Sequence, residues 1–455
     1  MTETFVSTVD RDRLEQLMSA ELERFARAHV RSGKLHEQAS ASLVDGVPMN
    51  WMTEWASPFP LFVEHASGAG FRCVDGHDYI DFCLGDTGAM AGHGPAPTIA
   101  AVERQMRRGI THMLPTEDAI AAGEELARRF GLPLWQFTMT ATDANRFAIR
   151  LARQITGRSK ILVHDACYHG SVDETLATLD EDGRVVASAG NIGPPVDPAL
   201  TSRVVPFNDV DALERALADE AVAAVLVEPA LTNVGIVLPE PGYHESLRAL
   251  TRKTGTVLII DETHTICAGP GGMTARDGLE PDMLVIGKTI GGGIPAGTYG
   301  MTTAIAERVR ASLPERADIG GIGGTLAGYA LSTAAIRATL GEVLTDEAFG
   351  RMIPLAERWE AGVNDVIRSH RLPWHVTRLG ARAEYHYLPS PPRDGAQQLA
   401  HVDPLLDRYL HLAAMNRGVL MTPFHNMALM SPATTAADVD RHTAVFDEAV
   451  TALTI

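Results

Sequence analysis

The sequence predicts an α/β protein whose larger domain is built on a mostly parallel β-sheet. Helix-like and strand-like segments alternate between about residues 115 and 310, and the strand-like segments are apolar along most of their length. Continuous apolar strands are typical of a parallel sheet that helices cover on both faces. A chain of 455 residues is longer than one hydrophobic core usually serves, so we also expect a second domain.

The predicted elements of the large domain follow one another in a regular order. Helices are expected at 119–130, 143–156, 210–219 and 242–254, and strands at 136–139, 160–164, 223–228, 257–261 and 283–286. We place this domain at residues 96–330. A smaller α+β domain is expected from both chain ends, residues 1–95 and 331–455, with helices at 11–32 and 439–452 and a short strand at 72–74.

Charge and hydropathy exclude several classes of protein. There are 39 Lys and Arg against 57 Asp and Glu, and the net charge of −18 argues against a nucleic-acid partner. The longest aliphatic runs, 221–227 and 256–260, are far shorter than the roughly 18 residues of a membrane span. The N-terminal stretch lacks the basic start and apolar run of a secretion signal, so we expect a cytoplasmic protein without a membrane partner.

The residues that end two of the apolar strands carry the strongest chemical signal. Asp261 ends one strand, and Lys288 follows the next. Ligands of open parallel sheets bind beyond the carboxyl ends of the strands. A buried aspartate there requires a cationic partner, and a buried lysine requires a reason to lose its proton. Pyridoxal 5'-phosphate supplies both, because its ring nitrogen can pair with Asp261 and its aldehyde can condense with Lys288.

These motifs resemble those of fold-type I pyridoxal phosphate enzymes, specifically class III aminotransferases of the glutamate-1-semialdehyde 2,1-aminomutase-like branch. The resemblance runs from about residue 58 to the end of the sequence and includes, in order and spacing, Asp261-Glu262, Pro281-Asp282, Gly287-Lys288 and the glycine-rich stretch 291–295. It implies a fold-type I PLP-transferase in which Lys288 is the Schiff-base lysine and Asp261 is the partner of the ring nitrogen. Both are therefore candidate catalytic residues.

The same resemblance implies further cofactor-binding residues. Tyr168, in a Tyr-His-Gly segment, is expected to stack on the cofactor ring, and His264 is expected near the ring hydroxyl. Glu228, in a Glu-Pro pair, is expected within hydrogen-bonding reach of polar groups of the site. Thr325 matches a threonine that the other subunit contributes to the phosphate, so the resemblance implies a homodimer with shared active sites.

A phosphate site is expected where the strand at 136–139 leads into the next helix. Backbone amides at a helix N-terminus, at Ala141 and Thr142, point along a positive dipole toward an anion. The family that this chain resembles has a glycine at the position of Ala141. Since alanine tolerates positive φ poorly, the turn must use negative φ at Ala141 or bear strain.

Other functions fit the sequence less well. A nucleotide triphosphatase requires glycine where Asp282 stands, and a nicotinamide-dependent dehydrogenase requires a G-x-G-x-x-G pattern that 291–297 lacks. The residues His164, Asp165, His169 and Asp173 have no recognised ligand spacing, and the four cysteines form no C-x-x-C pair, so no metal is expected. A non-enzymatic regulator is disfavoured because no DNA-binding segment is evident.

The sequence favours transamination between an amine or amino acid donor and a keto acid or aldehyde acceptor. Aminomutase relatives hold a substrate carboxylate with an N-terminal arginine, whereas the corresponding stretch 45–52 has none. Trp51 and Met52 there predict a relatively hydrophobic donor pocket. Arg382 is a candidate for holding a carboxylate, with a salt bridge to Glu384 or another acid as the alternative. An aminomutase or an epimerase remains the second enzymatic interpretation.

Overall fold

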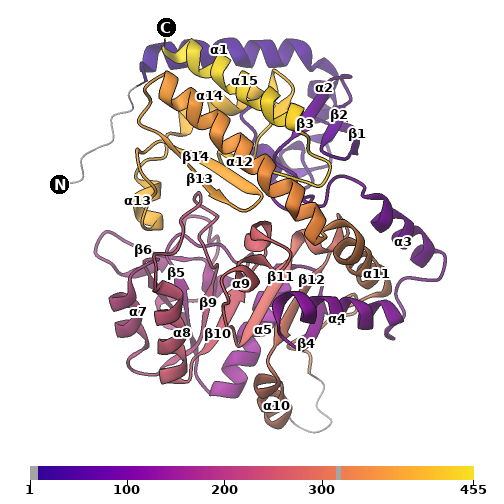
Figure 1. Ribbon diagram of the computed structural model, residues 1–455, viewed down its shortest axis with the longest axis vertical. Helices are drawn as coiled ribbons and strands as arrows, with labels where there is room; N and C mark the ends of the chain where they lie inside the picture. Colours follow the sequence, from indigo (N-terminus) through magenta and orange to yellow (C-terminus); the bar gives the residue numbers. More distant parts are fainter. Residues whose placement is uncertain (1–8, 314–318, 455) are drawn as a thin grey trace. The chain divides into compact units, whose positions relative to one another are not determined.

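The computed structural model describes residues 9–313 and 319–454 and shows a mixed α/β fold (Figure 1). Contacts within the chain divide it into two compact units. The large unit comprises residues 95–349 and 392–399, and the small unit comprises residues 1–94, 350–391 and 400–455.

The large unit is built on a seven-stranded sheet in the order β4-β12-β11-β10-β9-β5-β8. The strand bounds are β4 Leu134–Thr138, β5 Lys160–His164, β8 Ser202–Val205, β9 Val222–Val227, β10 Val257–Asp261, β11 Met283–Gly287 and β12 Gly297–Met301. Only β12 runs against the others, since it pairs antiparallel with both β11 and β4. The predicted α/β class with a mostly parallel sheet is therefore confirmed.

Strand β9 shows how the two faces of this sheet are filled. Ala224 and Leu226 belong to an apolar cluster that includes residues of α5 (Ala141–Thr156) and α10 (Thr303–Ser312). Val225 and Val227 belong to a second cluster with residues of α7 (Val210–Leu217) and α8 (Tyr243–Thr254). Because successive side chains of a strand point to opposite faces, a fully apolar strand is buried on both sides.

Two strands of this sheet, β8 and β12, lie outside the segments that the apolar pattern predicts. Strand β12 reads Gly-Thr-Tyr-Gly-Met and is buried along its whole length, yet it contains two glycines and no aliphatic run. Its Gly300 lies against the ring of Trp135, where a Cβ would be only 2.7 Å from the indole. Close packing thus selects glycine at a position where strand propensity alone argues against it.

The small unit contains two antiparallel-rich sheets and several long helices. One sheet has the order β1-β2-β3-β15 and the other β13-β14-β16. Their bounds are β1 Val63–Ser67, β2 Gly70–Cys73, β3 Asp78–Asp81, β13 His375–Leu379, β14 Arg382–His386, β15 Val419–Leu420 and β16 Met427–Leu429. The main helices are α1 Arg11–Ala28, α2 Val30–Ala39, α14 Pro404–Met415, α15 Ala436–Thr454 and, from residue 350 onward, α12 Asp346–Ser369.

The expected helix at 11–32 is two helices that meet at His29. His29 has non-helical backbone angles (φ −119°, ψ 48°), and its ring is buried with Nε2 2.7 Å from the Tyr79 hydroxyl. Burial of this ring against Tyr79 therefore accompanies the break. Across residues 9–313 and 319–454, none of the helices combines the length and the hydrophobicity that crossing a bilayer requires.

The chain leaves the large unit later than the predicted boundary at residue 330. Helix α11 (Ala330–Ala338) packs against α3 (Ala96–Met106) and α4 (Glu117–Phe130), so the change of unit falls at 349/350. The chain also returns briefly to the large unit at 392–399, which includes α13 (Gly395–Leu399). There the Arg393 guanidinium pairs with Glu240 at 2.8 Å.

Candidate active site

Asp261 and Lys288, which the sequence singles out, lie at the carboxyl ends of two neighbouring strands in the middle of the large sheet. Strands β10 and β11 are parallel neighbours, with Asp261 opposite Val285. Asp261 is therefore the last residue of β10, and Lys288 comes directly after β11. The Nζ atom of Lys288 lies 2.8 Å from Nε2 of His264, which follows β10. The topology thus brings Asp261, His264 and Lys288 to the same strand ends.

Asp261 is buried and held by three donors. Its side chain accepts hydrogen bonds from Asn145 Nδ2 at 2.8 Å and from the Thr263 amide at 3.0 Å, and it lies 2.9 Å from Nδ1 of His169. Burial would raise the pKa of Asp261, but the hydrogen bonds and the charge of His169 lower it below its ordinary value. Burial opposes the charge on His169, while Cys167 and Asp261 raise its pKa well above the ordinary value. Asp261 is therefore a carboxylate in the interior of the protein.

This donor set fits pyridoxal phosphate. The cofactor ring nitrogen carries a proton most readily beside a carboxylate, and its aldehyde reacts with an amine, which Asp261 and Lys288 supply. Within the described part of the chain, Asn145 Oδ1, His169 Nε2 and the Thr263 hydroxyl are buried side-chain atoms without a hydrogen-bond partner. Buried polar atoms of this kind are rare unless a ligand or water pairs with them.

The turn into α5 is the segment where the sequence predicts a phosphate site, and that role stays a prediction. Thr140 caps this helix, accepting from the Asp143 amide at 3.2 Å, and Ala141 is the first helical residue. Ala141 does not have positive φ, so the alanine is accommodated without strain of that kind. Gly170 packs on Thr142 so closely that a Cβ would overlap the threonine hydroxyl, and the Ser171 amide donates to that hydroxyl at 3.3 Å.

Glu228 organises the segment that carries Tyr168. It is buried at the end of β9, where it accepts hydrogen bonds from the Tyr168 amide at 3.2 Å and from the Thr232 hydroxyl. Burial raises the pKa of Glu228, and the charge of His169 and the Thr232 hydroxyl oppose this rise. Glu228 thus anchors the backbone of Tyr168, while stacking of the tyrosine ring on a cofactor stays a prediction.

Four other predicted residues belong to other segments of the chain. Thr325 is exposed in a turn at 325–328 of the large unit. In the small unit, Trp51 and Met52 are each 40% exposed, and the Trp51 ring meets Phe424 edge to face at 6.1 Å. Arg382 is fully buried with Nη2 3.1 Å from Glu384, which is the salt bridge that the sequence left open as an alternative.

Sequence reasoning did not assign Asn145 or His169 to the site. Asn145 is in the first two turns of α5, and His169 directly follows Tyr168, so both lie inside segments that the family resemblance already marked. Their contact with Asp261 depends on the folding of three separate segments onto one strand end. Among the residues that the structure describes, no group of His, Cys, Asp or Glu has a metal-binding arrangement.

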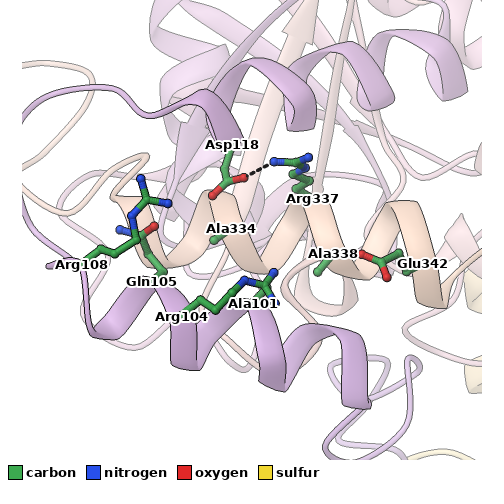
Figure 2. Close-up of a pocket in the computed structure, with 9 residues that line it drawn as sticks. All are labelled: Ala101, Arg104, Gln105, Arg108, Asp118, Ala334, Arg337, Ala338 and Glu342. Atoms are coloured by element: carbon green, nitrogen blue, oxygen red, sulfur yellow. Dashed lines mark hydrogen bonds and ion pairs between the residues drawn. The ribbon is translucent and has the colours of Figure 1, made fainter.

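A small polar cavity of about 190 Å³ lies elsewhere in the large unit, between α3, α4 and α11 (Figure 2). Arg104 of α3 and Arg108 of the turn that follows α3 border it, and Arg337 of α11 forms an ion pair with Asp118 at 2.6 Å. None of the predicted catalytic or cofactor-binding residues lines this cavity. The strand ends of β9, β10 and β11 therefore remain the candidate active site.

Family models, curated relatives and solved structures all relate this chain to the same family. Residues 51–450 match the model of the class-III aminotransferases. The chain is 33% identical over 391 residues to a glutamate-1-semialdehyde 2,1-aminomutase from Thermomicrobium roseum, covering 84% of this chain and 89% of the relative. A crystal structure of a glutamate-1-semialdehyde-aminomutase from Pseudomonas aeruginosa PAO1 in complex with PMP is 49% identical with a TM-score of 0.96, covering 98% of this chain and 99% of that chain.

A solved omega-transaminase from Sphaerobacter thermophilus is also similar, with 30% identity and a TM-score of 0.85 over 92% of this chain and 97% of that chain. The fold and the strand-end site together define a pyridoxal phosphate-dependent enzyme of fold type I. The chain belongs to the class-III aminotransferase family, and the resemblance seen in the sequence is confirmed.

Proposed function

We propose that this protein is an aminomutase, which moves an amino group between two carbons of a single substrate. The observation that supports this most directly is the 49% identity over 98% of the chain to a solved protein named glutamate-1-semialdehyde-aminomutase. The curated relative from Thermomicrobium roseum carries the corresponding name. These relatives favour the intramolecular reaction over the transamination that the sequence alone suggested.

The side chains at the strand ends have separate tasks in this reaction. When bound, pyridoxal phosphate supplies the electron sink that stabilises negative charge on the substrate carbon. Asp261, kept ionised by His169 and Asn145, holds the proton on the ring nitrogen. Lys288 would move a proton between the substrate carbon that carries the amino group and the aldehyde carbon of the cofactor. The N-terminus of α5 binds the phosphate through the amides of Ala141 and Thr142.

Glutamate 1-semialdehyde is the first substrate to test, because the relatives are named for it. A second candidate is transamination of a hydrophobic amine, which the exposed Trp51–Phe424 ring pair and the arginine-free stretch 45–52 favour. Large aromatic side chains line pockets for apolar ligands, whereas a carboxylate is usually held by a guanidinium.

We further propose a homodimer in which Thr325 of one subunit contributes to the phosphate site of the other. Its support is the match to the family motif at 323–328 and the exposure of Thr325 in a single chain. A hydroxyl that binds phosphate needs to reach the ligand, and an exposed turn is free to do so across a subunit boundary.

The reaction is tested with the holoenzyme and one substrate at a time. For an aminomutase, glutamate 1-semialdehyde alone is converted to its amino-shifted isomer without a keto acid. For a transaminase, a hydrophobic amine turns over only when an acceptor such as pyruvate is added. Lys288→Ala serves as the control and abolishes either reaction. Conversion that requires an acceptor in every case would overturn the proposal and leave transamination.

A further inference from the structure

The contact between Lys288 and His264 places a second titratable group on the reacting amine. His264 directly precedes the short helix Thr265–Ala268, and its carbonyl accepts a hydrogen bond from the Cys267 amide at 3.3 Å. Lys288 begins another short helix and has φ +51°, an unusual value for a residue other than glycine. Two separate backbone turns therefore position Nζ and Nε2 at 2.8 Å.

A separation of 2.8 Å requires that one of the two nitrogens donates and the other accepts. Two cations at this distance repel each other, so lysine and histidine do not both carry a full charge there. Either the ammonium donates to a neutral imidazole, or the imidazole donates to a neutral amine. The two states differ by the transfer of one proton along the existing hydrogen bond.

We propose that His264 is the proton partner of Lys288 when the cofactor is attached. The ammonium of Lys288 transfers one proton to Nε2 of His264, and the neutral Nζ then forms a bond to the aldehyde carbon. The aldehyde oxygen leaves as water with the two remaining amine hydrogens, and the proton on His264 returns to the nitrogen. Cofactor attachment precedes either amino transfer, so this role of His264 does not depend on which of the two the enzyme catalyses.

The need for such a partner follows from the chemistry of the bond that forms. Only a neutral amine can attack the aldehyde carbon, so an ammonium must first lose a proton. A neutral imidazole within hydrogen-bonding distance can accept that proton. General bases that are held within hydrogen-bonding distance typically accelerate a step by about 10²–10⁴-fold.

The other titratable groups at these strand ends have partners of their own. Asp261 contacts His169, and Glu228 accepts from Tyr168 and Thr232. Glu262, next to Asp261 on β10, accepts from the hydroxyls of Thr265 and Thr274 at 2.5 and 2.6 Å. Burial raises the pKa of Glu262, and those donors oppose the rise.

The test measures cofactor attachment rather than turnover. Apoprotein is mixed with pyridoxal phosphate between about pH 6 and 9, the linkage is trapped with borohydride, and the modified Lys288 peptide is quantified by mass spectrometry. We expect His264→Leu and His264→Gln both to slow attachment at pH 7 by about 10²-fold, with the deficit shrinking as the pH rises. Glutamine is the informative variant, because it keeps a hydrogen bond to Nζ but cannot take up a proton.

Matched measurements separate this role from a structural one. His112→Gln changes an exposed histidine of the same unit and is expected to attach the cofactor at the wild-type rate. The final extent of trapping at long times reports whether Lys288 remains accessible in each variant. A wild-type attachment rate in His264→Gln at pH 7 would overturn the proposal, since a hydrogen bond alone would then suffice. Slow attachment of both variants at every pH would do so as well.

Discussion

At the scale of single residues, the most informative feature is the charge that Asp261 keeps in the interior. A buried carboxylate is costly unless donors compensate the lost hydration. Asn145, His169 and the Thr263 amide provide that compensation and hold the pKa of Asp261 below its ordinary value. An amide in its place would keep the shape of the site but remove the charge that, in our proposal, holds a proton on the cofactor ring.

We therefore expect Asp261→Asn to bind the cofactor but to react slowly. The covalent linkage to Lys288 should still be trapped by borohydride, because the lysine and the phosphate site are unchanged. Removal of a preorganised electrostatic partner typically lowers turnover by about 10²–10³-fold. Single-turnover rates and the visible spectrum of the holoenzyme measure this. Asp211→Asn, on the exposed side of α7, is the control that should leave both unchanged.

The buried pair of Arg382 and Glu384 makes the stability of the small unit depend on pH. Burial raises the pKa of Glu384, but His425 and Arg382 outweigh it and lower the pKa to about 2. Because the folded-state pKa lies below the unfolded value of about 4.3, the stabilisation is present at neutral pH and is lost as the pH falls from about 5 toward 2. Arg382→Ala should cost about 3–5 kcal/mol at pH 7, since it leaves a buried charge uncompensated.

The measurement is urea unfolding of both variants at several pH values. Glu384→Gln should flatten the acid side of the stability profile relative to the wild type, because the residue no longer titrates. Arg358→Ala removes an arginine that pairs with Asp440 on the surface and should cost under about 1 kcal/mol. Equal losses for Arg382→Ala and Arg358→Ala would contradict a stabilising role of the buried pair.

At the scale of elements, the sequence predicted those strands that are apolar throughout. Strands β9, β10 and β11 were found because each carries five or six buried residues in a row. Strand β12 was not found, since its glycines are selected by Trp135 and by the backbone of Thr140 rather than by strand propensity. Likewise, Asp261 and Lys288 follow from the ends of apolar strands, whereas Asn145 and His169 reach the site only through tertiary packing.

Gly170 and Gly157, two glycines between elements, allow the role of the predicted phosphate turn to be tested. Gly170 and Gly157 both have positive φ, +82° and +69°, so alanine at either position costs about 1–2 kcal/mol of backbone strain. The space available to a side chain differs between the two positions. A Cβ at Gly170 would overlap Thr142, whereas a Cβ at Gly157 would contact nothing. We expect Gly170→Ala to weaken cofactor affinity by at least tenfold, and Gly157→Ala to lower only stability.

Equilibrium binding of pyridoxal phosphate, followed by its visible absorption, separates these two effects. Urea unfolding of the apoproteins gives the strain that both variants share. Equal cofactor affinities of Gly170→Ala and Gly157→Ala would show that the contact between Gly170 and Thr142 does not shape the phosphate site.

At the scale of the whole molecule, the role that we propose for Thr325 depends on assembly of two chains. The turn that carries it is exposed in a single chain, and the family motif assigns such a threonine to the site of the neighbouring subunit. If so, Lys288 and Thr325 of one site come from different chains. Two inactive variants, each defective in one of these residues, can then restore one complete site between them.

We expect this complementation when Lys288→Ala and Thr325→Ala chains are unfolded together and refolded as a mixture. Random pairing in a dimer gives about half mixed dimers, each with one intact site, so about a quarter of all sites should recover. Turnover and borohydride trapping at Lys288 both report the recovered fraction. If both residues of a site came from one chain, a mixed dimer would contain no intact site, and activity would stay at the average of the two separately refolded variants.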